Sequence, residues 1–188
     1  HNQSRRQRQM CIRDRKVNVH KYQIIREVDT AKMLHEMSDI EYDDRILLQG
    51  THESQDPFEL IGKSVTGESL EETRKRVRDM IEGRGYSDQN IDVPLFDTPY
   101  INSLMRELNL YYTRLIRLPP GKCYPLHEDT TVRVHIPIVT NEDNFFIIED
   151  EMIRLPVGSA YRIDTTRTHT FINASTESRV HMIGIEKS

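Results

Sequence analysis

The sequence predicts a mostly β domain with a jelly-roll architecture, that is, a double-stranded β-helix, with helices near the N-terminus flanking it. Two features of the chain support this prediction. After residue 109, short runs rich in Ile, Val, Tyr, Phe and Thr alternate with turn residues. Before that point, apolar residues recur at helical spacing in several segments. Many short strands in close succession are typical of a β-sandwich or a jelly roll.

The chain has 188 residues, a length that suits one domain better than two. Residues 1–15 hold five arginines and one acid, and the run from Arg5 to Arg15 resembles translated sequencing-adapter read-through. We therefore treat residues 1–15 as a disordered tail and a sequence artefact, and expect residues 16–188 to form a single domain. A genuine disordered tail and a basic arm for nucleic acid are the alternatives for this segment.

Charge and composition exclude several classes of protein. The formal net charge of −4 argues against general affinity for nucleic acid. No apolar run approaches the roughly 18 residues of a membrane-spanning helix, and no secretory signal is visible. The two cysteines make no disulfide framework. We therefore expect a cytoplasmic protein without a nucleic-acid or membrane partner, and its oligomeric state is left open.

The first elements are short. Residues 22–28 predict a strand. Asp29 or Thr30 then caps a short helix. The apolar face of this helix consists of Met33, Leu34 and Met37. Residues 45–49 predict another strand.

Two further helices are expected before residue 110. The first covers residues 70–82, where Ser69 and Glu72 form a capping box and Gly83 stands at the end. The second begins at Thr98 and Pro99, because proline is favoured in the first turn of a helix. Its inward face consists of Ile101, Leu104, Met105 and Leu108.

The remaining chain predicts eight strands, separated by turn signals that include Pro119-Pro120-Gly121 and Pro156-Val157-Gly158. Their expected positions are residues 110–118, 121–128, 131–139, 144–149, 152–156, 159–164, 169–174 and 178–186.

Candidate metal ligands occur within these strands. In a strand, residues i and i+2 point to the same side, so His127 and Asp129 can both face inward. His169 lies on a later strand. Two imidazoles and one carboxylate suit non-haem Fe(II), because they leave positions open for substrate and oxygen. A His-x-Asp pair also arises by chance, and a surface or core histidine is the alternative for His127.

A second layer of residues strengthens the interpretation. Arg133 and His135 continue the odd-numbered face of His127 and Asp129, provided that no bulge intervenes. Arg179 lies on the last strand. An arginine inside a barrel needs an anion, because an unpaired buried charge is costly. A dicarboxylate would satisfy it through bidentate contacts; a structural ion pair with Asp or Glu is the alternative for both arginines.

Together with Pro120-Gly121, these residues resemble the aspartyl/asparaginyl β-hydroxylase family of Fe(II)- and 2-oxoglutarate-dependent oxygenases. The family includes proline hydroxylase-like members from bacteria and phages, and this chain resembles those members because it has Asp129 where animal members have glycine. The similarity is strongest over residues 110–186 and extends weakly to residues 22–50.

The resemblance implies specific roles. His127, Asp129 and His169 would bind Fe(II) and form the catalytic centre. Arg179 would hold the far carboxylate of the cosubstrate 2-oxoglutarate, which Arg133 and His135 would also contact. With O2, the reaction would hydroxylate an amino acid or an amino-acid side chain in a peptide and release succinate and carbon dioxide. The partner would then be a small molecule or a peptide.

Other residues are assigned with alternatives. Ile116 falls where animal members have a serine near the cosubstrate, so Tyr112 and Arg114 are candidates to replace that contact. Cys123 is expected to be buried. Five residues are candidates for the mouth of the site, with strand packing or a solvated edge as the alternative for each: Tyr124, Tyr161, Arg162, Arg167 and Asn173.

Two other functional classes stay open at this point. A cupin-type metal enzyme without 2-oxoglutarate would explain the histidines but would leave Arg179 without an anion. A non-catalytic β-sandwich binding module would use the histidines and arginines in structural pairs and would bind no iron.

Overall fold

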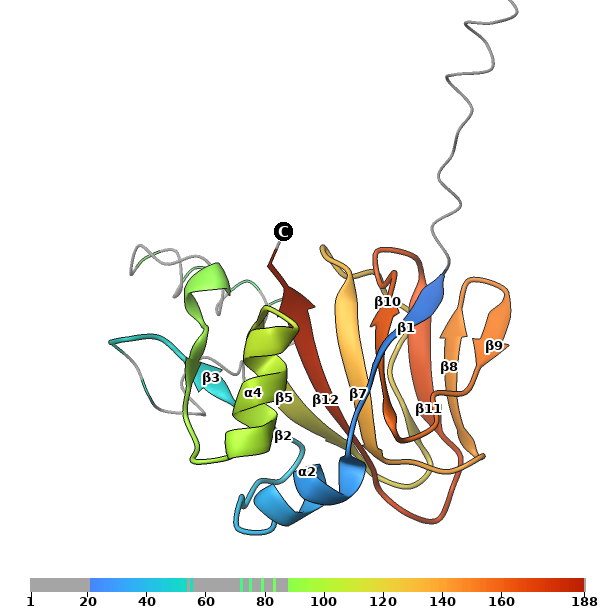
Figure 1. Cartoon of the computed structure of the whole chain (residues 1–188). Coiled ribbons are helices and arrows are strands. Elements are labelled where there is room, and N and C mark those ends of the chain that lie inside the picture. The colour runs from blue at the N-terminus through green and yellow to red at the C-terminus, as the bar shows by residue number, and fades with distance from the viewer. Residues whose placement is uncertain are drawn as a thin grey trace, which may run out of the picture.

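The structure is a computed structural model that describes residues 21–53 and 88–187 without a break, and between them only residues 55, 72, 75, 79 and 83. Figure 1 shows a β barrel-like body with helices against one side. The tail at residues 1–15 lies outside the described residues. The same holds for the predicted helix 70–82, apart from single positions within it.

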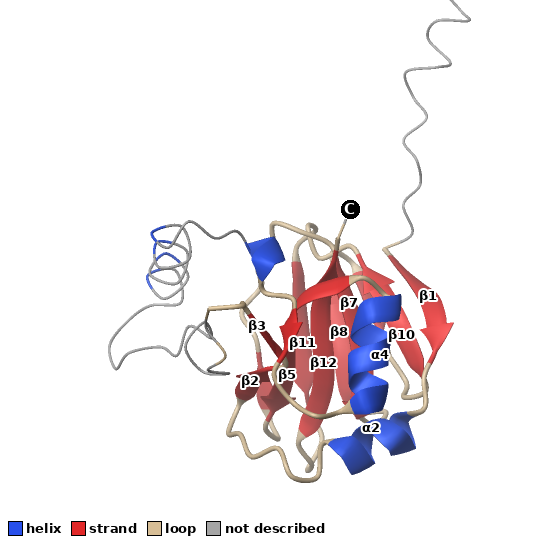
Figure 2. Cartoon of the chain, turned by 60° about the vertical axis from the view of Figure 1, so that its left-hand side comes forward, coloured by secondary structure: helices blue, strands red, loops and turns tan. Residues whose placement is uncertain are grey.

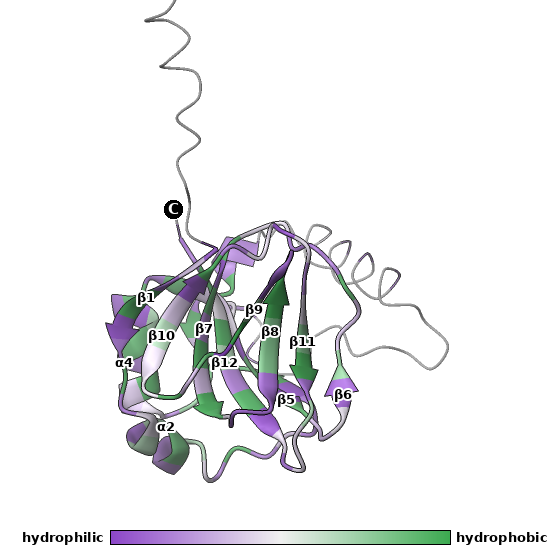
Figure 3. Ribbon diagram, turned by 90° about the vertical axis from the view of Figure 1, so that its right-hand side faces the viewer, coloured by the Kyte–Doolittle hydropathy of each residue, from purple (hydrophilic) through white to green (hydrophobic). Residues whose placement is uncertain are grey.

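Two antiparallel sheets form the body, with a short third sheet beside them (Figures 1 and 3). The six-stranded sheet contains, in spatial order, β1 (Tyr22–Glu27), β10 (Ser159–Ile163), β7 (Arg133–Val139), β12 (Arg179–Glu186), β5 (Leu110–Leu118) and β2 (Arg45–Leu47). The four-stranded sheet contains β6 (Lys122–Cys123), β11 (His169–Asn173), β8 (Asn144–Ile148) and β9 (Glu151–Ile153). The third consists of β3 (Gln49–Gly50) and β4 (Val93–Pro94). This arrangement confirms the predicted jelly roll.

The central strands of the large sheet are buried on both faces. On β7, the even-numbered Val134, Ile136 and Ile138 belong to one apolar cluster. The odd-numbered His135 faces the other way, and its ring centroid lies 5.2 Å from that of Phe171 on β11. The large sheet therefore has an outer apolar face and an inner face that meets the small sheet.

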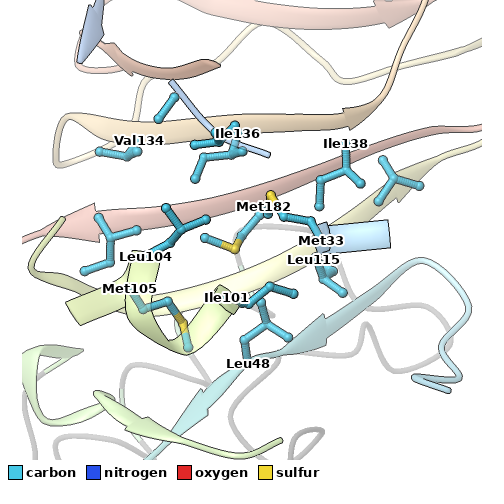
Figure 4. Packing of buried hydrophobic residues seen from close by; sticks show 14 of the residues in the cluster. Met33, Leu48, Ile101, Leu104, Met105, Leu115, Val134, Ile136, Ile138 and Met182 are labelled. Carbon is cyan, nitrogen blue, oxygen red and sulfur yellow. The ribbon is translucent and has the colours of Figure 1, made fainter. Parts of the chain in front are cut away.

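Two helices cover the outer face: α2 (Thr30–Glu36) and α4 (Pro99–Glu107). Figure 2 shows both helices on the same side of the strands. Figure 4 shows Met33 of α2 and Ile101 and Leu104 of α4 packed toward Met182 of the sheet, and all four side chains are fully buried. The expectation for Leu34 was wrong, because its side chain is 46% exposed. A helix of this length turns only a narrow stripe toward the sheet.

The space between the two sheets holds a second apolar cluster. Its buried members are Leu118, Phe146, Ile148, Ile153, Leu155, Tyr161, Ile163 and Phe171. Figure 3 shows the hydrophobic character of β8, which contributes to this cluster. No helix among the described residues is long and apolar enough to cross a bilayer.

The two helices are joined by a capping interaction that the sequence did not predict. Thr98 precedes α4, but its side chain caps no backbone N–H of the helix; its hydroxyl donates to the Asn102 Oδ1 at 3.2 Å. Instead, the carboxylate of Glu36 accepts hydrogen bonds from the backbone N–H groups of Tyr100 at 2.7 Å and Ile101 at 2.9 Å. An acid at a helix N-terminus satisfies free donors and interacts favourably with the helix dipole. Glu36 thereby ties the end of α2 to the start of α4.

We expect the substitution Glu36→Ala to lower the free energy of unfolding by about 1–2 kcal/mol, the range of a lost helix cap. Urea unfolding followed by circular dichroism measures this change. Glu41→Ala is a control that removes an exposed acid from a loop. An equal loss of stability in both variants would contradict the capping role.

Candidate metal centre

A pair of backbone hydrogen bonds brings the two histidines of the site together. The His127 N–H donates to the His169 carbonyl at 3.1 Å, and the His169 N–H donates to the His127 carbonyl at 2.9 Å. This is an isolated antiparallel bridge at the start of β11. The ring centroids of the two residues lie 4.3 Å apart. Residues that are 42 positions apart in sequence thus become neighbours.

The carboxylate is positioned by the same two segments. The Asp129 N–H donates to the Thr165 carbonyl at 2.8 Å. The Thr165 hydroxyl in turn donates to the Thr131 carbonyl at 2.7 Å. The stretch from residue 127 to 131 is therefore fastened at several points along the stretch from residue 165 to 169.

The structure differs from the sequence prediction in how His127 and Asp129 are brought together. Residues 121–128 were expected to form a strand, and the alternation of that strand was expected to turn His127 and Asp129 inward. The strand β6 covers only Lys122–Cys123, and β7 begins only at Arg133. His127 and Asp129 come together through the hydrogen bonds to residues 165–169 and not through strand alternation, because pairing with the distant segment replaces a regular ladder here.

Both imidazole rings are fixed in one orientation by backbone carbonyls. The His127 Nδ1 lies 2.8 Å from the Pro125 carbonyl oxygen, and the His169 Nδ1 lies 2.9 Å from the Arg167 carbonyl oxygen. A carbonyl can only accept, so each Nδ1 carries the proton and donates. Each Nε2 is then the lone-pair nitrogen that can bind a metal.

His127, Asp129 and His169 form a group that could hold a metal ion. One ligand atom from each residue lies within 4.8 Å of the others, and the His169 Nε2 lies 3.8 Å from the Asp129 Oδ2. Two imidazole nitrogens and one carboxylate oxygen suit a divalent transition metal and leave coordination positions for other molecules.

The surroundings of His169 favour the neutral form that a metal needs. Its side chain is 1% exposed and stacks on Phe146 with a centroid distance of 5.4 Å. Burial lowers the pKa of His169 below its ordinary value. Arg133 contacts the same carboxylate oxygen, because its Nε donates to the Asp129 Oδ2 at 3.3 Å. The ion-pair alternative for Arg133 is therefore present in the structure.

Arg179 has a different environment. Its side chain is buried and lies over the Phe171 ring, with 4.3 Å from the guanidinium carbon to the ring centroid. Its Nε donates to the His181 Nε2 at 3.0 Å. Within the described chain no carboxylate forms an ion pair with Arg179, and burial lowers its pKa to about 9. The residue stays charged at neutral pH and lacks an anion.

His135 and His181 are buried histidines of the same interior. Among the described residues, neither ring nitrogen of His135 has a hydrogen-bond partner. Burial and the charge of Arg179 hold the pKa of both His135 and His181 well below the ordinary histidine value. Both rings are therefore neutral at physiological pH, and the His135 ring has free polar atoms for a ligand.

Most of the residues considered for the mouth have structural partners instead. Tyr161 is buried and donates to the Pro156 carbonyl, and Arg162 pairs with Glu186 on the outer side. Asn173 donates to the carbonyls of Leu118 and Glu177.

Two neighbours of the metal centre fill other roles. Arg167 pairs with Asp164 and Glu149, and Tyr124 lies beside the site, with its ring centroid 6.4 Å from that of His127. Cys123, expected to be buried, is exposed, because β6 is a short edge strand.

Comparison with known proteins supports the assignment of this chain to a family. The sequence profile of the family described as aspartyl/asparaginyl beta-hydroxylase matches residues 90–184. The matched region includes all three candidate metal ligands as well as Arg133, His135 and Arg179. A search of curated proteins finds no match.

Several solved structures are similar to part of this chain. A cupin domain from Bordetella pertussis Tohama I is 22% identical, with 40% of this chain and 80% of that chain covered and a TM-score of 0.36. A predicted oxalate decarboxylase from Thermotoga maritima is 15% identical, with 46% and 73% covered and a TM-score of 0.37. A cupin-2 domain containing protein from Shewanella frigidimarina is 21% identical, with 42% and 72% covered and a TM-score of 0.33. These similarities say nothing about activity.

We expect one divalent metal ion to bind per chain and the substitution His169→Ala to abolish this binding. Anaerobic titration with Fe(II) or Mn(II), followed by calorimetry, measures the stoichiometry and affinity. Protons compete with the metal for the imidazole nitrogens, so the affinity for the metal should fall at acid pH. Because burial lowers the pKa of His169, protons compete for this ligand only below a pH of about 6.5. His52→Ala, which changes an exposed histidine, is the control. One tightly bound ion in the His169 variant would refute the ligand set.

We also expect the metal-free protein to lose stability as the pH falls below about 6.5, the ordinary histidine pKa. His135 and His181 have lowered pKa values in the folded state, so the unfolded chain binds more protons in this range. Each histidine then contributes a loss of up to about 1.4 kcal/mol per pH unit. Urea unfolding across the pH range should show a shallower dependence for His181→Gln than for His52→Gln. Identical slopes would show that His181 does not titrate on unfolding.

Proposed function

The chain belongs to the aspartyl/asparaginyl β-hydroxylase family, and from this premise we propose that it is an Fe(II)- and 2-oxoglutarate-dependent dioxygenase. It hydroxylates an amino acid or an amino-acid side chain. In this proposal, the iron ligands are His127, Asp129 and His169. The anion that binds inside the barrel is 2-oxoglutarate.

The observation that carries the proposal is the buried guanidinium of Arg179. A buried cation without a counter-ion is unfavourable, and a structural ion pair would have removed the difficulty. The described part of the chain supplies no such pair. A carboxylate from a ligand would satisfy the guanidinium through two parallel hydrogen bonds.

The donor set also fits the metal. Fe(II) accepts the combination of two imidazoles and one carboxylate, with the remaining positions open. When bound there together, iron, 2-oxoglutarate and O2 supply the oxidation: the cosubstrate is converted to succinate and carbon dioxide, and one oxygen atom is inserted into a C–H bond of the substrate.

The protein's own residues bind and orient the reactants. Arg179 holds the distal carboxylate of the cosubstrate. His135, which is neutral and has free ring nitrogens, donates one hydrogen bond to the cosubstrate. Arg133 keeps the Asp129 carboxylate in place through its Nε, and its buried Nη1, which has no partner among the described residues, is available to the same ligand.

The apolar walls exclude water from the site. Phe146 stacks against His169, and the Phe171 ring contacts both His135 and Arg179. Removing water strengthens the electrostatic contacts between the cosubstrate and its ligands and protects the oxidising step from side reactions. A cupin-type enzyme without 2-oxoglutarate would use the same metal ligands but would leave the buried Arg179, which has no ion-pair partner among the described residues, without a function.

We expect the substitution Arg179→Gln to weaken 2-oxoglutarate binding by about 100-fold or more, because removal of one partner of a buried charge pair costs roughly 3–5 kcal/mol. Arg179→Lys should also lose affinity, since a point charge does not reproduce the guanidinium fork. Titration of 2-oxoglutarate into the anaerobic, iron-loaded protein measures both effects. Iron binding should survive in both variants.

Arg162→Gln is the matched control, because it removes an arginine of the same sheet, on strand β10, that pairs with Glu186 on the outside. Wild-type affinity for 2-oxoglutarate in the Arg179→Gln variant would make Arg179 structural and favour the cupin-type alternative. Succinate formation from 2-oxoglutarate, Fe(II) and O2 is the direct test of the proposed class.

A further inference from the structure

The loop that carries two of the candidate metal ligands is held in part by a side chain from outside the loop. Residues 127–131 belong to no strand of the described chain. At one end of the loop, His127 forms an isolated bridge with His169. Beyond this bridge, the part of the loop that begins at Asp129 is in contact with Thr165.

Thr165 contacts the loop through two different groups. Its carbonyl accepts a hydrogen bond from the Asp129 N–H at 2.8 Å. Its hydroxyl donates a hydrogen bond to the Thr131 carbonyl at 2.7 Å. An acceptor and a donor of the same residue thus hold both ends of the stretch from Asp129 to Thr131.

The hydroxyl supplies a donor that the backbone of Thr165 does not offer to the loop. The Thr165 N–H donates to the Ile163 carbonyl at 2.9 Å, in a tight turn at the end of β10. Without the hydroxyl, residue 165 would present an acceptor to the Asp129 N–H but no donor to the Thr131 carbonyl. The second contact with the loop therefore depends on the type of side chain at this position.

The segment around Thr165 is anchored independently of the loop. The Thr165 side chain is fully buried. Before it, the Asp164 N–H donates to the Lys21 carbonyl at 2.9 Å. After it, the Arg167 guanidinium pairs with the Glu149 carboxylate at 3.1 Å. The position of the Thr165 hydroxyl is therefore set by contacts on both sides of its own segment.

The Asp129 carboxylate depends on this support. Its Oδ2 lies 3.8 Å from the His169 Nε2 and accepts from the Arg133 Nε at 3.3 Å. Arg133 contacts only the carboxylate, whereas Thr165 fixes the backbone from which the carboxylate extends. Groups that orient a metal ligand from outside the coordination sphere influence the affinity for the metal, because they determine whether the ligand atom lies at bonding distance.

We propose that Thr165 is a positioning residue of the metal centre, and that its hydroxyl holds the loop so that Asp129 reaches the metal bound by His127 and His169. The inference rests on the metal ligands of the proposed function and does not depend on the cosubstrate. The role belongs to the hydroxyl donor. Serine can therefore fill it, and valine, which has a similar shape but no donor, cannot.

The test compares Thr165→Val with Thr165→Ser. Anaerobic titration with Mn(II), followed by calorimetry, measures the affinity for the metal. We expect Thr165→Val to weaken Mn(II) binding by about 10- to 100-fold, the range for loss of a group that orients a metal ligand. Thr165→Ser should restore most of the affinity, because it returns the donor.

A spectroscopic measurement separates positioning from a loss of stability. The d–d absorption bands of Co(II) depend on the arrangement of its ligands. At saturating Co(II), these bands should be shifted in Thr165→Val and should match the wild type in Thr165→Ser. A threonine that only stabilised the fold would leave the bands of the saturated protein unchanged.

Thr98→Val is the matched control. It also removes the hydroxyl of a buried threonine, which donates to the Asn102 Oδ1 at the start of α4, and it should bind Mn(II) like the wild type. Urea unfolding of the metal-free proteins shows whether each variant is folded under the titration conditions. If Thr165→Val does not fold, Thr165→Ala takes its place with the same expected results, because it also lacks the donor.

Three results would overturn the proposal: the variant without the hydroxyl binds Mn(II) as tightly as the wild type, its Co(II) bands coincide with those of the wild type, or Thr165→Ser fails to restore the affinity. A wild-type protein that binds no metal is a different failure, because it refutes the ligand set of the proposed function and this role with it. Metal binding that responds to Thr165 as expected supports the role even if no succinate forms from 2-oxoglutarate.

Discussion

The burial of strands β7 and β12 on both faces is the constraint on which the rest of the structure depends. A strand alternates its side chains between two environments, so each of these strands must satisfy two different requirements. The outer residues, among them Ile136 and Met182, pack against helices α2 and α4. The inner residues are then free to be polar, because hydrophobic burial on the outside already holds the sheet in place. His135 and Arg179 are tolerated at the centre of the fold for this reason.

Long-range backbone pairing complements this constraint at the metal centre. The ligand-bearing loop at residues 127–131 has no regular strand of its own, yet it is held by hydrogen bonds to residues 165–169. The carbonyls of Pro125 and Arg167 then fix the two imidazole rings. Positioning is thus achieved mainly by main-chain groups, which cannot be removed by a substitution of a side chain. The side chains are left to provide the ligand atoms.

The sequence predicted the architecture well because periodicity is local information. The strands from β5 to β12, the short helix after Asp29 and the helix after Thr98 follow from patterns within about ten residues. The residues of the candidate site could also be predicted from the sequence, because histidine, aspartate and arginine at strand spacing are compatible with few kinds of site. Pairing between distant segments carries no local signal. For that reason the strand assigned to residues 121–128 was too long, and the cap that Glu36 provides for α4 was missed. The sequence did not predict that Leu34 and Cys123 are exposed, because the exposure of a side chain depends on residues that are close in space but distant in the sequence.

The charge of the interior links the ligands of the site to the stability of the fold. Arg114 and Arg133 repel each other in a medium of low dielectric constant, and this repulsion is lost when the chain unfolds. Any anion that binds only the folded state therefore adds to stability in proportion to the logarithm of its concentration relative to its dissociation constant. Arg133 contacts the chain's own Asp129, and in the proposed function the anion of Arg179 is the cosubstrate.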